Sequence, residues 1–383
     1  MRSPIRFRIH SSLLAAAAIL AASPVAAQTE TSRVSVHGFL TQGYARGWEG
    51  QVYGASTAGT TDYRTAALQV RYDADENDNF LIQFNHERVG SSPMYRSKPV
   101  VDLDWAFVEH RFTPGTSVRV GRVKLPVGIY NETRKVGTLM PLYRAPMVVY
   151  TDVVLASESL DGISIGRHSE GGAWDVDLDA YFGGWRYRQT DFEVEGAIRN
   201  AVGGQAWLYT PLSGLRVGLG GRRFDSDYYA DVGVPDNQRQ RGTQWQASLD
   251  GTFARGFVRG ELQETRVRTA GEDAGGSTSR FRSFYGQVGV TPLPRLTLVG
   301  QAEKLVVRYD VTQPAVMTFD NPAIREYTAG ARFAFRPDLV AKAEYHWTRG
   351  IQYEDGAGDF TSRFTANAQR DVRYGIVSVS YAF

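Results

Sequence analysis

Arg373-Tyr-Gly-Ile-Val-Ser-Val-Ser-Tyr-Ala-Phe383, the end of the chain, alternates strictly between two sets of side chains. The two sets are Gly375, Val377, Val379, Tyr381 and Phe383, and Tyr374, Ile376, Ser378, Ser380 and Ala382. A period of two with one apolar side is the pattern of a β-strand. A strand at a chain terminus would leave an unpaired edge in a large sheet unless the sheet closes on it. The segment therefore predicts a closed barrel.

The first 27 residues have the pattern of a cleaved export signal. Arg2, Arg6 and Arg8 precede an apolar run over residues 13–22, and small residues at 25–27 precede Gln28. A transmembrane helix is the alternative, but Pro24 ends the run short of a span. We expect residues 1–27 to be removed and residues 28–383 to form a single barrel domain.

The composition excludes several classes of protein. Removing residues 1–27 takes away three arginines and no acid, so the formal net charge falls from +2 to −1 and indicates no nucleic-acid partner. The chain has no cysteine, which excludes disulfides and thiolate metal sites. Beyond the signal, no apolar run approaches the roughly 18 residues of a membrane helix. Only a closed barrel would hide such polar strands in lipid.

Sixteen segments alternate between apolar and polar residues and are predicted to be antiparallel strands of a transmembrane, all-β barrel. They are residues 33–45, 62–73, 79–88, 101–112, 117–124, 160–167, 173–183, 200–210, 215–224, 243–253, 257–267, 281–290, 295–309, 325–335, 340–349 and 372–383. Short turns alternate with long polar connections, which is typical of such barrels with both termini on the periplasmic side. Fourteen or eighteen strands would also fit.

Residues 173–183 indicate most clearly which face meets lipid. Trp174, Leu178 and Phe182 would face outward, because the opposite arrangement would put three carboxylates in hydrocarbon. Those three, Asp175, Asp177 and Asp179, would line a water-filled lumen. Their spacing would suit Ca²⁺ with help from a neighbouring strand, but pairing with lumen arginines is the favoured interpretation. We expect no metal and no cofactor.

The terminal Phe383, with Tyr381 and the alternating valines, resembles the assembly signal of Gram-negative outer-membrane β-barrels. The resemblance implies an outer-membrane porin that is recognised by the outer-membrane assembly machinery. It also implies contact with membrane lipid and lipopolysaccharide, a homotrimeric assembly, and passive passage of small hydrophilic solutes or ions.

Residues 124–159 are much less polar than the other long connections. Their apolar residues include Val127, Ile129, Leu139, Met140, Leu142, Met147, Val148, Val149, Val153, Val154 and Leu155. Apolar area is worth roughly 25 cal/mol per Å² when buried, so the segment must pack against something. In porins the third outer loop follows strand five and folds into the barrel, and residues 124–159 resemble it in place and character. Packing on the outer rim or on a neighbouring subunit is the alternative.

Charges of both signs in this segment are the candidates for a pore constriction: Arg134, Lys135 and Arg144 against Glu132, Asp152 and Glu158. The resemblance adds Arg122 as part of a basic wall. The alternation of Val118 and Val120 points Arg122 outward, however, unless a bulge at Gly121 reverses the register. Further lumen-lining candidates, beside the three aspartates, are Arg71, Arg216, Arg222, Arg259 and Arg332.

Other functions stay open as alternatives to passive diffusion. A phosphate- or anion-selective channel would need a ladder of arginines across the lumen, and a sugar channel would need a run of aromatic residues along it. An enzyme is disfavoured because the sequence has no Gly-x-Ser-x-Gly and no His-Glu-x-x-His motif, so we expect no catalytic residues. An adhesin would also have long loops, but it would not need a segment like 124–159.

Overall fold

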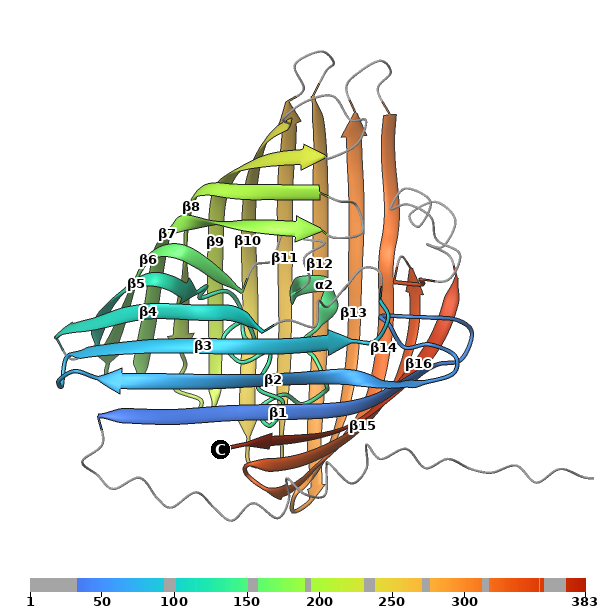
Figure 1. Cartoon of the computed structure of the whole chain (residues 1–383), viewed down its shortest axis with the longest axis horizontal. Coiled ribbons are helices and arrows are strands. Elements are labelled where there is room, and N and C mark those ends of the chain that lie inside the picture. Colours follow the sequence, from blue (N-terminus) through green and yellow to red (C-terminus); the bar gives the residue numbers. More distant parts are fainter. Residues whose placement is uncertain are drawn as a thin grey trace, which may run out of the picture.

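Sixteen antiparallel strands form one closed barrel, in which each strand pairs with its neighbours in sequence and β16 pairs with β1 (Figure 1). The computed structural model describes residues 33–92, 101–113, 115–150, 158–189, 194–230, 238–270, 276–311, 317–350, 352–354 and 370–383. The predicted strand number and the predicted closure are confirmed. The expected export signal lies outside the described residues.

The first eight strands are β1 (Val34–Gly47), β2 (Thr60–Asp73), β3 (Asp78–Val89), β4 (Asp102–Thr113), β5 (Thr116–Lys124), β6 (Ser159–Gly171), β7 (Trp174–Gln189) and β8 (Val194–Tyr209). The others are β9 (Leu215–Ala230), β10 (Gln238–Phe253), β11 (Gly256–Ala270), β12 (Ser277–Leu293), β13 (Leu296–Val311), β14 (Met317–Arg336), β15 (Leu339–Gly350) and β16 (Asp371–Ala382). A single helical turn, α2 (Met147–Tyr150), lies between β5 and β6 in the sequence. The described residues include no helix long and apolar enough to cross a membrane.

The carboxyl-terminal residue closes the barrel. Phe383 N donates to Gly38 O at 2.9 Å, and Gly38 N donates to Phe383 O at 3.0 Å. The ring of Phe383 lies over Gly38, where an added Cβ would meet the ring at 2.5 Å. Tyr381 stacks on Phe383 with 6.1 Å between ring centroids. The last strand thus has both of its edges paired, which removes the free edge that the sequence pattern argued against.

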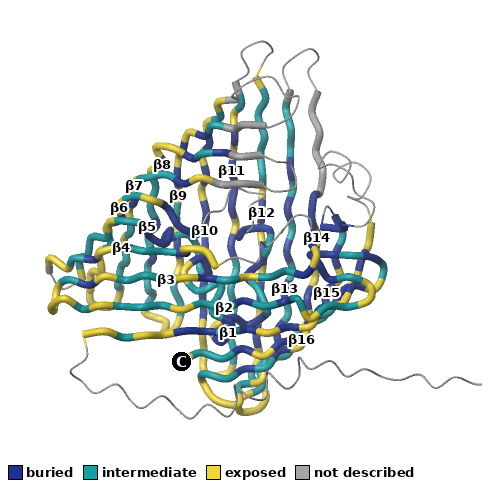
Figure 2. The backbone as a smooth tube through the Cα atoms, in the orientation of Figure 1, coloured by how far each residue is buried: buried dark blue, intermediate teal, exposed yellow. Residues whose placement is uncertain are grey.

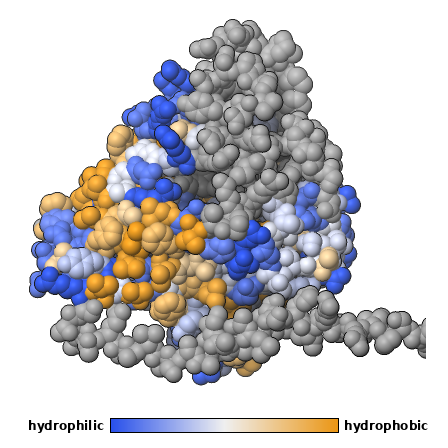
Figure 3. All heavy atoms as spheres, viewed as in Figure 1, coloured by the Kyte–Doolittle hydropathy of each residue, from blue (hydrophilic) through white to orange (hydrophobic). Residues whose placement is uncertain are grey.

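The barrel is apolar outside and polar inside. Trp174, Leu178 and Phe182 are exposed on the outer face, as predicted, whereas Gln246, Ser248 and Asp250 of β10 are buried inside. Figure 2 shows this alternation of buried and exposed residues along the strands, and Figure 3 shows a hydrophobic band over the wall that faces the viewer. A surface of this kind suits a lipid surrounding, and a polar interior suits water.

Strand length divides the wall into two parts. The strands β7–β14 have 15 to 20 residues, whereas β1–β6, β15 and β16 have 9 to 14. The sequence prediction placed much of the extra length, such as residues 238–242 of β10, in long polar loops. It was wrong there because both faces of these strand ends are polar, so no alternation of apolar residues marks them.

Candidate functional site

The connection between β5 and β6 passes through the barrel interior. Its backbone N–H groups donate to side chains on the inner faces of three strands: Gly128 N to Gln205 Oε1 at 2.6 Å, Ile129 N to Glu261 Oε1 at 3.0 Å, and Val148 N to Glu303 Oε2 at 3.1 Å. Its carbonyl groups accept from two more, since Arg332 donates to Thr138 O at 2.8 Å and Lys342 to Leu142 O at 2.9 Å. Residues 125–150, called the inner segment below, are therefore tied to β8, β11, β13, β14 and β15.

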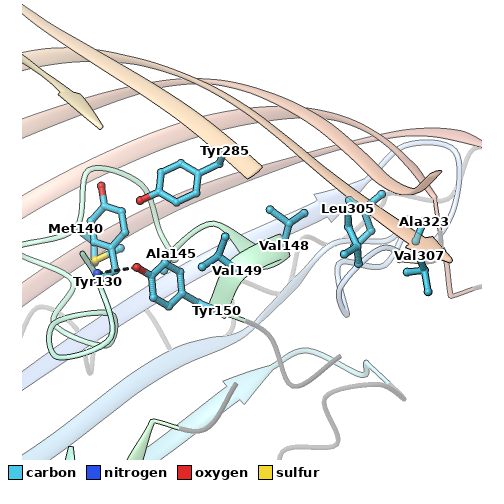
Figure 4. Packing of buried hydrophobic residues seen from close by; sticks show 11 residues of the cluster. Tyr130, Met140, Ala145, Val148, Val149, Tyr150, Tyr285, Leu305, Val307 and Ala323 are labelled. Carbon is cyan, nitrogen blue, oxygen red and sulfur yellow. Dashed lines mark hydrogen bonds between the residues drawn. The ribbon is translucent and has the colours of Figure 1, made fainter. Parts of the chain in front are cut away.

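Apolar packing also holds the inner segment against the wall, at β12–β14. Tyr130, Met140, Ala145 and residues 148–150 form one buried cluster with Tyr285, Leu305, Val307, Ala323 and Ile324 of β12–β14. Figure 4 shows these side chains of the segment and of α2 directed toward the strands. Much of the apolar content of residues 125–150 is thus buried between the segment and the wall, although Leu139 is exposed. Val153, Val154 and Leu155 lie outside the described residues.

Glu261 links the inner segment to the wall most extensively. Its carboxylate accepts from Ile129 N, from the hydroxyls of Tyr150 and Tyr285, and from Gln246 and Ser248. Gly128 is required beside it, because it has a positive φ of 65° and an added Cβ would meet Tyr150, Gln246 and Glu261 within 2.5 Å.

The root of the inner segment is an ion cluster. Glu158 accepts from Arg134 at 2.5 Å and forms an ion pair with Lys135 at 2.8 Å, while Lys135 donates to Asp104 of β4 at 3.1 Å. Lys124 lies 3.6 Å from Glu158. Burial alone would raise the pKa of Glu158, but the charges of Arg134, Lys135 and Lys124 outweigh it and hold that pKa well below its usual range.

A second polar cluster fixes the far part of the segment. Arg144 donates to Tyr374 Oη at 2.6 Å and lies over the Tyr53 ring, 4.0 Å from its centroid. Tyr374 in turn donates to Glu326, and its ring stacks on His346 at 4.2 Å. Arg144 is therefore enclosed by aromatic rings.

A chamber of about 660 Å³ lies on the other side of the interior, between the inner segment and β4–β9. Pro126, Gly128 and Ile129 form its boundary on the segment side. Charged residues of both signs line it, including Glu109, Arg119, Glu132, Asp177, Asp179 and Arg216. Residues of the short turns, such as Asn77 and Gly115, also line it, so the chamber lies toward the short-turn end of the barrel.

A much smaller space of about 10 Å³ adjoins the chamber. Pro126 and Val127 border it on one side, and the wall residues Tyr181, Gln205, Gly220, Arg222, Gln244 and Gln246 border it on the other. This space is called the slit below. Arg222 is buried there, with its guanidinium 5.4 Å from the Trp185 ring and 5.5 Å from the Phe224 ring.

The predicted constriction residues are distributed over several places. Arg134, Lys135 and Glu158 come together, but with one another at the root of the segment rather than facing open space. Glu132 lines the chamber. Asp152 lies outside the described residues. The sequence did not indicate these pairings, because they depend on the path of the segment.

Arg122 does not line the lumen, so its predicted place in a basic wall of the pore is wrong. Gly121 pairs with Phe107 and Gly162 in regular register, so no bulge reverses the strand there. Arg122 follows the outward parity of Val120 and lies 3.4 Å from Asp161 at the outer surface. The irregularity lies in β4 instead, where Asp104 is skipped in the pairing with β3 and is buried next to the root cluster.

The predicted lumen residues lie on the inner face and are largely paired. Arg216 and Arg259 share Asp250 at 2.9 Å each, and Asp177 accepts from Tyr209 at 2.6 Å and lies 2.5 Å from His168. Arg71 pairs with Asp73 near a short turn. Arg332 holds the inner segment through Thr138. Asp175 shares the inward parity of Asp177 and Asp179. Among the described residues no group of side chains has the arrangement of a metal site.

Glu344 of β15 also anchors the inner segment, because it accepts from Tyr143 N. Sequence reasoning missed these anchors, Gln205, Glu261, Glu303 and Glu344. Each is a polar residue at an inward position of a strand, and this parity is the only signal that the sequence carries for them. Many other inward polar residues share that signal, so it does not single them out.

No protein-family model matches the chain, and no curated protein matches its sequence. Solved structures share its fold. OmpT of Vibrio cholerae, in a trimer form, is 10% identical over 91% of this chain and 99% of that chain, with a TM-score of 0.58. The outer membrane channel DcaP of Acinetobacter baumannii is 10% identical over 91% and 97%, with a TM-score of 0.55. An anion-selective porin from Comamonas acidovorans is 13% identical over 91% and 99%, with a TM-score of 0.51. The chain therefore has the fold of an outer-membrane porin.

Proposed function

We propose that the protein is an outer-membrane channel that small hydrophilic solutes or ions cross passively, through the chamber and the slit. The observation that carries this proposal is the 660 Å³ chamber with a charged lining, inside a barrel whose outer surface is apolar. A solute that crosses here passes between Pro126–Val127 and the wall of β7–β10. The protein performs no chemistry on the solute.

The same proposal includes the cellular location of the channel. We place it in the outer membrane of a Gram-negative bacterium, after cleavage behind Ala27 and assembly that depends on Phe383. The apolar outer surface and the terminal strand support this placement. A homotrimer is proposed by analogy with the trimer form of the similarly folded OmpT.

Planar-bilayer recording of the purified protein tests the proposal. We expect discrete conductance steps in salt solution, and a Gly220→Phe variant should reduce each step several-fold because the ring is larger than the slit and would obstruct it. A Cβ at Gly220 is tolerated, since its nearest contact would be Gly204 O at 3.4 Å. Gly286→Phe is the matched control, because Gly286 faces outward and an added Cβ there meets nothing within 4 Å. Absence of steps from the wild-type protein would overturn the channel.

A further inference from the structure

The chamber is lined by equal numbers of basic and acidic side chains. Four arginines and four acids border it, and the lining also includes His168, which pairs with Asp177 at 2.5 Å. A lining of this kind gives no general advantage to a simple anion or to a simple cation. It favours a molecule that carries both charges when the two signs are separated along the wall.

Glu132 and Asp179 form the acidic side of the chamber. Asp179 of β7 lies within electrostatic reach of Glu132 on the inner segment. Neither carboxylate forms a hydrogen bond or an ion pair with any residue that the structure describes. Two carboxylates that face each other in a confined space repel each other, and a cation between them removes that repulsion. This side of the chamber therefore suits an ammonium group.

Arg119 of β5 provides the basic side. Its Nε donates to Glu109 at 2.6 Å, and Glu109 also lies 3.1 Å from Arg111, so two guanidinium groups share one carboxylate. Within the described parts of the chain, the two Nη atoms of Arg119 have no acceptor. The open edge of a guanidinium group matches the two oxygens of a carboxylate. This side of the chamber therefore suits the carboxylate of a solute.

The wall between Arg119 and Asp179 is made of small residues. Arg119 pairs in register with Ser164 of β6, and Asp179 pairs with Gly166, which itself pairs with Ser117 of β5. All three of these small residues line the chamber. The strands β5 and β7 lie two strand spacings apart, about 10 Å. Two extended residues span at most about 7 Å and a hydrogen bond at each end adds about 3 Å, so a dipeptide is long enough to bridge the two sides.

We propose that the chamber binds zwitterionic solutes of about the length of a dipeptide. The ammonium group of the solute lies between Glu132 and Asp179, and its carboxylate accepts from the Nη atoms of Arg119. The hydroxyls of Ser117 and Ser164 face the polar groups in between. This inference rests on the proposed function, because it names the class of solute that the channel binds during passage.

Four probes with the same number of non-hydrogen atoms test the two charges separately. Glycylglycine is the zwitterion, glycylglycinamide the cation, N-propionylglycine the anion and N-propionylglycinamide the neutral molecule. Binding of each probe to the folded barrel in detergent is measured by saturation-transfer NMR at about pH 7 and about 0.15 M salt. We expect glycylglycine to bind about tenfold more tightly than either singly charged probe, because it forms charged hydrogen bonds at both ends. The neutral probe should bind most weakly.

Glu132→Gln with Asp179→Asn removes the acidic side of the chamber. This double variant should bind glycylglycine about tenfold more weakly, but it should bind N-propionylglycine at least as tightly as the wild type, because Arg119 is unchanged. The matched control is Glu76→Gln with Glu170→Gln, which removes two acids at the same end of the barrel that do not line the chamber. The control should bind all four probes like the wild type. Heat-modifiable gel mobility verifies that each variant is folded.

Three results would overturn the inference: equal affinity of the wild type for glycylglycine and any other probe, equal losses of glycylglycine binding in both double variants, or no loss in either. Equal binding of glycylglycine and glycylglycinamide would mean that the chamber binds ammonium groups alone. Conductance is recorded separately and without probes. A protein that conducts but does not prefer glycylglycine refutes this inference alone, and one that binds glycylglycine but does not conduct refutes the channel alone.

Discussion

The two halves of the barrel interior differ in how the inner segment meets the wall. Against β11–β16, the segment is packed through buried tyrosines and valines and through hydrogen bonds to Glu261, Glu303 and Glu344. Toward β4–β9 it is attached only near its root, at Asp104, and at Gln205, and beside these contacts it leaves a chamber of about 660 Å³. The position of a passage through such a barrel is therefore set by the wall that binds the segment, because the open side is what remains.

At the slit, the wall of the open half has a glycine, Gly220, where the filled half has long polar side chains. Gly220 lies on the inner face beside Gln205, and only Pro126 and Val127 of the segment border the slit. The filled half instead presents carboxylates that accept from the segment's backbone, and a buried N–H without an acceptor is costly. The filled half holds the segment along most of its length, whereas the open half holds it near its root and at Gln205 and leaves space beside it.

Removing Glu261 should weaken the attachment of the inner segment to the filled half more than any other single change discussed here. Glu261→Ala takes away the acceptor of five hydrogen bonds at the contact between segment and wall. We expect the segment to detach more readily by on the order of 3 kcal/mol. Trypsin added to the folded barrel should then cleave after Arg134 or Lys135 about 100-fold faster, because protease access follows the open population.

Glu264→Ala is the matched control for that experiment. Glu264 lies on the same strand and is also buried, but it faces outward among arginines. Equal acceleration of cleavage in both variants would show that general destabilisation, rather than loss of the anchor, releases the segment.

Neutralising Arg222 should have a smaller effect, confined to ion selectivity. A fixed charge a few Å from a permeating ion changes its energy by about 1 to 4 kcal/mol in a narrow, poorly solvated space. Arg222→Gln should therefore shift the reversal potential in a salt gradient toward cation preference. Arg71→Gln, which removes a paired charge near a short turn, should shift it little. Equal shifts would place the selective region outside the slit.

The smallest expected effect is on pH dependence: protonation of Glu158 at low pH should weaken the ion cluster at the root of the segment. The lowered pKa of Glu158 means that its carboxylate stabilises the folded state above its unfolded pKa of about 4.3 and loses this contribution as the pH falls through its folded value. The contribution of Glu158, read as the difference in thermal stability between the wild type and Glu158→Gln, should be constant from about pH 8 to 5 and fall below. Glu158→Gln should lower stability at pH 7 and reduce the loss of stability in acid, whereas an unchanged acid profile would contradict the role of Glu158.

The sequence was informative wherever one side of a strand had to be apolar. Leu178 and Phe182 opposite Asp177 and Asp179 predicted both the strand and its orientation, and the apolar content of residues 124–159 predicted the packing seen for residues 125–150 against the wall. Outer strand ends such as residues 238–242 were missed because neither face is apolar there.

Pairing of charges was not predictable in the same way. Arg134 and Lys135 were expected to face an opening, yet both bind Glu158, and Arg144 lies among Tyr53 and Tyr374. These partners come from sequence positions up to 230 residues apart, and which of them meet depends on the path of the segment through the barrel.

Cysteine accessibility is the most direct test of passage through the open half, because the chain has no cysteine of its own. A charged methanethiosulfonate reagent should reduce the conductance of Gly220→Cys at the slit. It should leave Thr328→Cys unchanged, because Thr328 is buried in the filled half beside His346, 3.0 Å from its Nδ1. Block of Thr328→Cys without block of Gly220→Cys would contradict the proposed route.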